Sequence, residues 1–296
     1  MDARHIEQIR SFNRTVTRRI GALDDGYLSR GRPLGEARMI FEIGARGGVD
    51  LRTLRQKLGL DSGYQSRLLR SLEAQGLVKL RKSANDARSR HVRLTKKGEG
   101  EFAAYDALSD RLAVSILTPL GNARRERLVA AMAEVERLLR ADLVELAVEA
   151  PDTSDARWCL NQYYAELAER FESGFDPAQG NELAEAEMRS PAGYLILARV
   201  DGDPIGCGVL KRLTADTGEI KRVWIAPQMR GCGLADKLMD ALEVQARSVG
   251  FRLVKLDTNR ALTEAHALYR KRGYYAIARY NANPYAHHWF EKQLGG

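Results

Sequence analysis

Cysteines are scarce in this sequence, and long apolar runs are absent. Its 296 residues include three cysteines with no CxxC spacing among them, so neither a disulfide framework nor a zinc site is indicated, and no metal is expected. No run approaches the roughly 18 apolar residues of a membrane span. The opening segment, MDARHIEQIR, lacks the apolar core of a signal peptide. These absences argue against a disulfide-rich secreted domain and against a membrane partner, and we expect the chain in the cytoplasm.

The composition is typical of a globular protein, and its charge is unevenly placed. Hydrophobic residues make up 44% of the chain and charged residues 29%, and the length allows two domains with cores of their own. Residues 1–150 carry 28 Lys and Arg against 20 Asp and Glu, whereas residues 151–296 carry 19 of each. Residues 51–100 alone hold 13 basic against 4 acidic residues. This local excess predicts a polyanionic partner for the first half.

A strand, a glycine-rich turn and a helix are predicted within residues 219–242, EIKRVWIAPQMRGCGLADKLMDAL. The first part is rich in β-branched and aromatic residues and stops at a proline, and apolar residues recur at helical spacing from Leu234. A helix begins with unpaired N–H groups and a partly positive end. Gly231 and Gly233 let an anion approach those groups, and Arg230 adds a full charge. The turn is therefore predicted to hold a phosphate, although it matches neither GxGxxG nor a P-loop.

This turn resembles the acetyl-CoA pyrophosphate loop of GNAT-superfamily N-acetyltransferases. The loop pattern Q-x-R-G-x-G-x-A is matched at Gln228, Arg230, Gly231, Gly233 and Ala235. The superfamily's A-x-x-L-Y-x-x-x-G-F/Y is matched about 30 residues downstream at Ala265, Leu268, Tyr269, Gly273 and Tyr274. A glycine-rich turn alone would fit any α/β protein, but two motifs in the right order favour the superfamily. The resemblance covers residues 143–296 and implies acetyl-CoA as the acetyl donor.

The resemblance also implies a set of coenzyme contacts. Strand residues Val223, Trp224 and Ile225 are expected to contact pantetheine and the thioester carbonyl through their main chain. The diphosphate is expected at the turn, on Gln228, Arg230, Gly231, Cys232, Gly233, Leu234 and Ala235. Cys232 holds a variable position and is not expected to be a nucleophile. Leu262 stands where many members have an asparagine, which leaves Thr258, Asn259 or Thr263 to contact pantetheine.

Acetyl transfer to an amine requires a neutral amine, charge stabilisation at the carbonyl and a proton for the leaving thiolate. Tyr269 matches the superfamily tyrosine that serves as general acid; the alternative is a core aromatic. Glu219 lies in the strand where several members place a general base; the alternative is an ion-pair partner of Lys221 or Arg222. Because strand side chains alternate, Glu219 and Lys221 are expected on one face and Arg222 on the other. Lys221 or Arg222 in the acceptor pocket would suit an amine that also carries a carboxylate.

Two short helices in the first half, 51–58 and 61–75, are predicted to form a helix-turn-helix. The second has Asp61 or Ser62 as its N-cap. Its outward residues are predicted to reach DNA, namely Ser62, Tyr64, Gln65, Arg67 and Arg70. An arginine on a helix surface is otherwise only solvated, so the prediction depends on the segment that follows.

That segment is predicted to be a basic β-hairpin, with arms 78–82 and 91–94. Helix, hairpin and turn resemble the MarR family of transcription factors. The matches are Leu69, Leu72, Glu73, Gly76, Leu77, Val78, Asp86, Arg88, Val92, Leu94, Thr95 and Gly98. By this resemblance Arg88, and with it Arg90, enters a minor groove, while Arg81 and the other basic residues contact phosphates. A buried pairing of Asp86 with another arginine is the alternative.

Two long helices are predicted next, at 102–117 and 123–146, where 143–148 could already be a strand. With the first helix, 5–23, they resemble the dimerisation helices of the MarR family. A homodimer with two-fold symmetry implies a pseudo-palindromic double-stranded DNA operator.

The predicted fold is therefore two domains. Residues 1–142 form an all-α winged helix-turn-helix domain with a β-wing, and residues 143–296 form an α/β GNAT fold with a mixed, mostly antiparallel sheet. The predicted function is a bifunctional transcriptional regulator and N-acetyltransferase that acetylates a primary amine, possible acceptors including an amino acid. The alternatives are a regulator whose second domain senses acetyl-CoA or a ligand without significant turnover, and a protein-lysine acetyltransferase.

Overall fold

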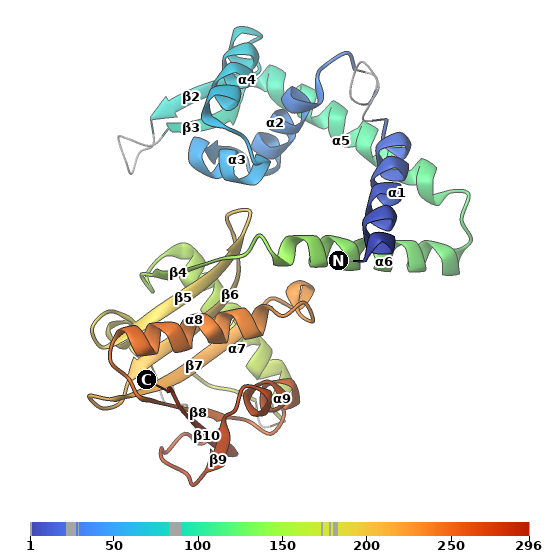
Figure 1. Ribbon diagram of the computed structural model, residues 1–296. Coiled ribbons are helices and arrows are strands. Elements are labelled where there is room, and N and C mark those ends of the chain that lie inside the picture. Colours follow the sequence, from blue (N-terminus) through green and yellow to red (C-terminus); the bar gives the residue numbers. More distant parts are fainter. Residues whose placement is uncertain are drawn as a thin grey trace. The chain divides into compact units, whose positions relative to one another are not determined.

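Two units make up the computed structural model (Figure 1), which describes residues 2–21, 28, 30–82, 90–172, 174–177, 179 and 183–295. The units are Met1–Ala131 and Met132–Gly296, and the division falls inside helix α6 (Asn122–Ala141). Within the described residues, no helix is both long enough and apolar enough to cross a membrane.

The first unit is helical apart from a small antiparallel sheet with strand order β1-β3-β2. Its elements are α1 (Ala3–Arg19), α2 (Leu34–Ala45), β1 (Val49–Asp50), α3 (Leu51–Leu58), α4 (Ser62–Ala74), β2 (Val78–Lys82), β3 (Arg90–Leu94) and α5 (Lys96–Leu117). Asp61 is the N-cap of α4, where its side chain accepts from the Tyr64 N–H at 2.8 Å. The predicted hairpin is confirmed by the pairing of β2 with β3.

The core of the first unit holds α4 against α2. Met39, Ile40 and Leu72 are fully buried between them. A polar contact adds to this packing, because the Glu36 carboxylate of α2 accepts from the Ser71 hydroxyl of α4 at 2.7 Å. Arg32 pairs with the same carboxylate at 2.7 Å. The orientation of α4 is therefore set by both apolar burial and a charge-assisted hydrogen bond.

The second unit is built on a seven-stranded sheet with strand order β4-β5-β6-β7-β8-β10-β9. Its strands are β4 (Glu145–Glu149), β5 (Gly193–Val200), β6 (Asp203–Arg212), β7 (Thr217–Ile225), β8 (Leu253–Thr258), β9 (Tyr275–Ile277) and β10 (His288–Gln293). Its helices are α7 (Ser154–Arg170), α8 (Leu234–Ser248) and α9 (Thr263–Lys271), with short 3-10 segments η2 (Glu185–Met188) and η3 (Pro227–Met229). Only the β7–β8 pair is parallel among the described ladders, which confirms the predicted mixed sheet.

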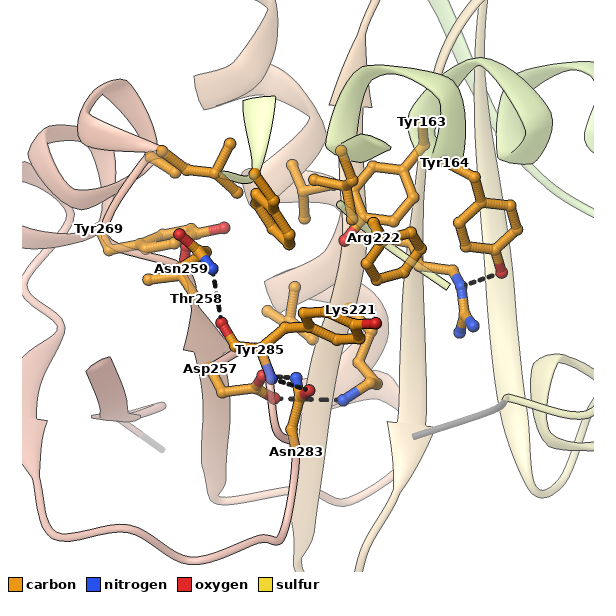
Figure 2. A pocket seen from close by; sticks show the side chains of 17 residues that line it. Tyr163, Tyr164, Lys221, Arg222, Asp257, Thr258, Asn259, Tyr269, Asn283 and Tyr285 are labelled. Carbon is orange, nitrogen blue, oxygen red and sulfur yellow. Dashed lines mark hydrogen bonds and ion pairs between the residues drawn. The ribbon is translucent and has the colours of Figure 1, made fainter. Parts of the chain in front are cut away.

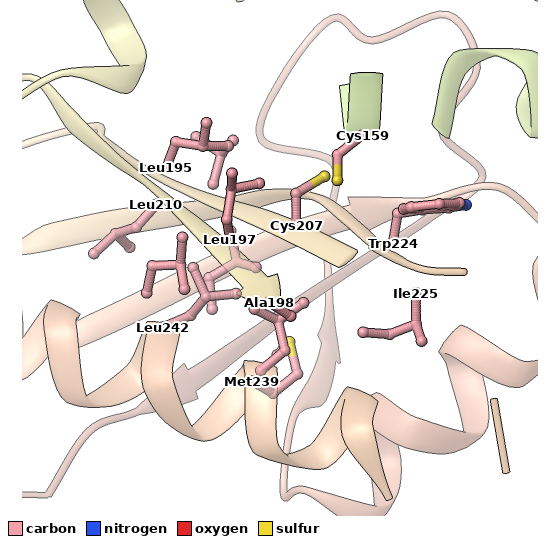
Figure 3. Close-up of a cluster of buried hydrophobic side chains, with 14 of the residues drawn as sticks. Cys159, Leu195, Leu197, Ala198, Cys207, Leu210, Trp224, Ile225, Met239 and Leu242 are labelled. Atoms are coloured by element: carbon pink, nitrogen blue, oxygen red, sulfur yellow. The ribbon is translucent and has the colours of Figure 1, made fainter. Parts of the chain in front are cut away.

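Helices α7 and α8 cover opposite faces of this sheet. Neighbouring strand residues point to opposite faces, and on β6 the Cys207 side chain lies against Cys159 of α7. A side chain at the next residue, Gly208, would collide with Leu242 of α8 at 2.7 Å. Figure 3 shows Leu242 and Met239 of α8 on the side of the sheet away from Cys159. The core therefore has two apolar layers with β6 and β7 between them.

Strands β7 and β8 separate partway along their length, and this separation makes room for a site. Their pairing covers Thr217 to Glu219. Beyond it, β7 carries a β-bulge, in which Arg222 and Val223 both lie opposite Gly208. Arg222 has a left-handed φ of 53°, a conformation that costs a non-glycine residue on the order of 1–3 kcal/mol.

One predicted boundary is wrong. The helix predicted at 123–146 ends at Ala141, because residues 145–149 form the edge strand β4 and pair with β5. The alternative of a strand near 143–148 is the right one. Val144 and Leu146 pack against the core of the second unit, whereas Leu143 and Val148 stay exposed.

Candidate functional site

Two cavities lie at the place where β7 and β8 separate. The larger, of about 580 Å³, lies between the end of β7, the start of α8, and α9. Its lining includes Glu166, Arg170, Trp224, Ile225, Arg230, Gly231, Gly233, Leu234, Ala235, Asp236, Glu264, Leu268 and Lys271. Most residues of the predicted coenzyme set are therefore brought together around one cavity.

The smaller cavity, of about 100 Å³, is shown in Figure 2. Its lining includes Tyr164, Phe171, Phe175, Ile220, Lys221, Arg222, Asp257, Thr258, Asn259, Asn283 and Tyr285. Both cavities share six further lining residues: Tyr163, Leu167, Val223, Leu262, Ala265 and Tyr269. The two cavities therefore adjoin, and Tyr163, Val223 and Tyr269 lie at their junction.

The turn needs glycines because of its left-handed backbone conformation, and not because a side chain would lack space. Gly231 and Gly233 have φ values of 80° and 82°, which side chains rarely tolerate. A Cβ at either position would meet no atom within 4 Å. Gly233 is the N-cap of α8, and no side chain caps this helix end. The first amides of α8 therefore remain available to an anion in the larger cavity.

Arg230 is held by a carboxylate that the sequence reasoning did not single out. Its guanidinium pairs with Glu166 of α7, and its Nε donates to the Ile225 carbonyl at 2.9 Å. Glu166 also accepts from Trp224 Nε1 at 2.9 Å and pairs with Arg170 at 3.2 Å. Burial opposes ionisation of Glu166, but the hydrogen bonds from Arg230 and Trp224 hold its pKa below the ordinary value. An anion that takes Arg230 must therefore compete with Glu166.

Three residues of the predicted coenzyme set lie outside the larger cavity. Gln228 is exposed on η3 and does not line it. The Cys232 thiol turns back to the Met229 carbonyl, with an S···O distance of 3.0 Å. Asn259 lines the smaller cavity instead, where its amide donates to the Tyr285 carbonyl at 2.8 Å and accepts from the Ala261 N–H at 2.9 Å. Asn259 thus fastens the segment at 283–287 to the end of β8.

Tyr269 of α9 is buried at the junction, with 7% of its surface exposed. Its ring packs against Tyr274 and Phe290. Burial, together with the negative charge of Asp257, raises the pKa of Tyr269 well above its usual range. The phenol is therefore protonated at neutral pH and can donate a proton toward either cavity.

Glu219 lies outside both cavities, contrary to its predicted position as a general base. It is 1% exposed and is not among the residues that line either cavity. Its Oε1 accepts from the Tyr280 hydroxyl at 2.9 Å and from the Asn281 amide at 3.1 Å, and it pairs with Lys221 at 3.3 Å. In this structure the carboxylate holds the segment after β9 against β7.

The expectation that Arg222 faces away from Lys221 is wrong. Both side chains line the smaller cavity. The bulge opposite Gly208 places an extra residue in β7, so the simple alternation of faces fails at this point. Lys221 is already paired, at 3.2 Å with Asp257 and at 3.3 Å with Glu219.

Several residues of the smaller cavity were missed from sequence. Tyr163 and Tyr164 lie on α7, and Asp257 lies near the end of β8. Asp257 accepts from the amides of Asn281 and Asn283, which follow β9. The adjacent tyrosines on a predicted helix were a usable signal. The two asparagines left no signal in the sequence, because their position depends on how the loop before β10 folds back.

The predicted DNA-contacting residues of α4 are mostly exposed. Ser62, Tyr64, Arg67 and Arg70 are exposed, and the Arg67 guanidinium lies 5.7 Å from the centre of the Tyr64 ring. The prediction that Gln65 faces outward from this helix is wrong. Gln65 is 6% exposed, and its amide donates to the Leu51 carbonyl at 2.7 Å, which links α4 to the start of α3.

On the hairpin, Arg81 and Arg90 are exposed at the described ends of β2 and β3. Arg88 and Asp86 lie outside the described residues. The exposed arginines of α4 and of the hairpin come from adjacent segments of one unit, as the winged helix-turn-helix prediction requires.

Comparisons with known proteins agree with both halves. A model of the acetyltransferase (GNAT) family matches residues 160–274, and a model of the MarR family matches residues 30–89. The chain is 31% identical over 111 residues to the IAA acetyltransferase of Azospirillum brasilense, covering 37% of this chain and 72% of that protein. It is 32% identical over 120 residues to the uncharacterized N-acetyltransferase YjgM of Escherichia coli K12, covering 39% of this chain and 71% of that protein.

A solved structure of a GNAT family acetyltransferase from Elizabethkingia anophelis with acetyl-CoA bound is similar at a TM-score of 0.39 and 18% identity, covering 51% of this chain and 99% of that one. The two family matches confirm the predicted fusion. The chain joins a MarR family domain to a GNAT domain and belongs to the GNAT acetyltransferase family.

Proposed function

We propose that this protein is a DNA-binding regulator whose second domain transfers acetyl from acetyl-CoA to a primary amine of a small molecule. The observation that carries this proposal is the junction of the two cavities at Tyr163, Val223 and Tyr269. A thioester in the larger cavity and an amine in the smaller one would meet there. Holding two reactants in this way supplies much of the rate of such transfers.

The residues of the larger cavity fit the coenzyme. The main chain at Gly231 and Gly233, with the free amides of α8, would hold the diphosphate, and Arg230 would add a charge after leaving Glu166. Val223 lines both cavities and Ile225 lines the larger one, where their main chain would contact the pantetheine. Acetyl-CoA supplies the activated acetyl group, and the chain's own residues position it.

Tyr269 is proposed to give its proton to the departing thiolate, because it lies at the junction of the two cavities. Changing Tyr269→Phe removes that proton and little volume. We expect kcat to fall about 100-fold, the usual effect of losing a general acid. The affinity for coenzyme A, measured by calorimetry, should stay nearly constant. Unchanged turnover would remove Tyr269 from the mechanism.

A second candidate function is a sensor whose coenzyme binding alters DNA affinity without useful turnover. The MarR family domain in the same chain favours it. A ligand that binds the two DNA-binding states unequally shifts operator affinity, and DNA shifts ligand affinity by the same factor. Coenzyme A thiol release in a broad amine screen separates the two functions. Release with any amine supports the enzyme, whereas binding that changes DNA affinity without release supports the sensor.

For the first unit we propose a homodimer on a pseudo-palindromic operator. Helix α1 has no buried residue, and four apolar side chains repeat along it at exposures of 36–56%: Ile6, Ile9, Phe12 and Val16. An apolar stripe of this kind on a single chain suits a second copy. Multi-angle light scattering of the full chain tests it. Phe12→Glu should shift a dimer toward monomer, whereas a wild-type monomer at micromolar concentration would contradict the proposal.

A further inference from the structure

Arg222 of β7 is a buried cation with an unused donor. Its side chain lines the smaller cavity, and the residue is 8% exposed. Its Nε donates to the Tyr164 hydroxyl at 2.6 Å, and the guanidinium lies 5.2 Å from the centre of the Tyr164 ring (Figure 2). Its Nη1 is buried without a hydrogen-bond partner among the described residues. Burying a charged donor without a partner is costly. An anion that binds Arg222 Nη1 would remove this cost.

The neighbouring cation does not share this property. Lys221 is paired with both Glu219 and Asp257, whereas Arg222 Nη1 has no hydrogen-bond partner among the described residues. A described carboxylate whose charge does reach Arg222, Glu187 of η2, is itself paired with Lys211 at 2.7 Å. Glu219 and Asp257 thus serve Lys221 and, in addition, the amides that follow β9. Of the two cations that line this cavity, Arg222 is therefore the one with a donor left over within the described part of the chain, and that donor is available to a ligand.

A second buried polar atom in the same cavity also lacks a partner. Thr258, at the end of β8, is 6% exposed, and its Oγ1 has no hydrogen-bond partner among the described residues. A hydroxyl can donate to a carboxylate or accept from an amine. Arg222 Nη1 can donate to a ligand's carboxylate, and the Thr258 hydroxyl can bind either its carboxylate or its amine. The two groups therefore suit a ligand that carries both charges of an amino acid.

The remaining wall of the cavity is aromatic. Phe175 lies 4.9 Å from Tyr285 and is stacked on Tyr164 at 5.9 Å, measured between ring centres. Phe171 lies 5.8 Å from both Phe175 and Tyr285. Flat apolar walls favour a ring. A polyamine or an aminoglycoside would instead bring several positive charges beside the Arg222 guanidinium, which is unfavourable.

We propose that the acceptor is a small aromatic amine that carries a carboxylate, an aromatic α-amino acid or a close analogue, and that Arg222 binds its carboxylate. This proposal rests on the proposed function in one respect, namely that the smaller cavity is the acceptor site. With the carboxylate on Arg222 and the ring against Phe175 and Tyr285, the amine is left to point toward the junction at Tyr269.

The test compares four amines with the full chain and acetyl-CoA: L-phenylalanine, phenethylamine without the carboxylate, L-alanine without the ring, and spermidine. Thiol release gives kcat/KM for each. We expect L-phenylalanine to exceed phenethylamine by up to about 100-fold, the range of one charge-assisted hydrogen bond. L-alanine should be at least about 10-fold poorer than L-phenylalanine. Equal or better use of phenethylamine or spermidine would overturn the proposal.

The variant arm uses Arg222→Gln, with Arg252→Gln as the matched control because Arg252 is exposed and lines neither cavity. With Arg222→Gln, the kcat/KM values for L-phenylalanine and phenethylamine should differ by less than about 3-fold, mainly because KM for L-phenylalanine rises. The control should keep the full preference. Retention of the preference in Arg222→Gln would overturn the role of Arg222. If Arg222→Gln does not fold, the four-amine comparison with wild type still decides the substrate class.

Failure of the proposed function gives a different pattern. If no amine gives thiol release but calorimetry shows that coenzyme A binds, the proposed acetyltransferase activity is wrong. The class of ligand in the smaller cavity can then still be tested by binding. Titration of L-phenylalanine and phenethylamine into the coenzyme A complex then takes the place of kinetics. Preference for L-phenylalanine that is lost in Arg222→Gln supports the proposal, and equal or absent binding of both overturns it.

Discussion

The two units differ in the exposure and ion pairing of the cations at their predicted sites. On α4 and the hairpin, Arg67, Arg70 and Arg81 are exposed and pair with no carboxylate among the described residues. In the second unit, two cations near the larger cavity are paired with carboxylates. Arg230 pairs with Glu166, and Arg272 is shared by Asp236, Asp240 and Glu243.

This difference indicates two kinds of anion recognition. Exposed, unpaired cations attract a polyanion at long range and release counterions when they bind it. A paired cation must exchange one anion for another, so its net gain is small and its choice depends on geometry. Arg222 differs from both kinds, because it is buried and its Nη1 has no hydrogen-bond partner among the described residues.

The largest expected effect is a contrast in salt dependence. Raising salt from about 50 to 200 mM should weaken binding of a selected DNA duplex about 1000-fold. Over the same range, coenzyme A affinity should fall less than about 10-fold, because one diphosphate releases few ions. Fluorescence anisotropy measures the first affinity and calorimetry the second. Equal salt slopes for the two ligands would show that the comparison is false.

The next effect tests the turn in the second unit. Gly233→Ala adds a methyl group at a left-handed position that borders the larger cavity. We expect about 1–2 kcal/mol of backbone strain and a loss of coenzyme A affinity of about 30-fold, since the amides must shift. Gly250→Ala is the matched control, because Gly250 has φ 87° and open space but lines neither cavity. The control should lose similar stability in urea unfolding and keep its coenzyme affinity; equal loss of affinity in both would contradict the assignment.

Local patterns in the sequence predicted those features that depend on neighbours along the chain. Asp61 caps α4 because an extended residue with a short acceptor precedes the helix. Gly231 and Gly233 are left-handed because the strand must turn sharply into α8. The family motifs extended these local predictions to two folds, and both family matches confirm them.

Features that depend on distant partners were predicted wrongly or not at all. Gln65 was predicted to face outward, although its spacing to Leu68 and Leu69 puts it on the buried face of α4. No signal in the sequence indicated its bond to the Leu51 carbonyl, which lies on another helix. Arg222 joins the face of Lys221 because Gly208, on another strand, opposes two residues of β7. Glu166 gave no signal, because its partners Trp224 and Arg230 lie 58 and 64 residues further along the chain.

A smaller effect is expected at Glu219. Glu219→Gln keeps the shape of the side chain and removes the charge that pairs with Lys221. Because Glu219 lines neither cavity, we expect kcat/KM to fall less than about 5-fold, with no shift in the pH profile. The protein should lose about 3 kcal/mol or more of stability, as when one partner of a buried ion pair is removed. A 100-fold fall in kcat, with the acidic limb of the pH profile lost, would restore Glu219 as the general base.

The smallest effect, and the most direct test of paired against unpaired cations, is at Glu166. Its lowered pKa keeps it ionised between about pH 6 and 8, so its competition for Arg230 is constant there. Glu166→Gln keeps an oxygen that can accept from Trp224 but removes the charge that opposes the diphosphate. We expect coenzyme A to bind about 3-fold more tightly, a gain limited by solvent screening of Arg230, whose side chain is 40% exposed. The sign matters more than the size, because weaker binding would mean that Glu166 orients Arg230 for the coenzyme rather than competing with it.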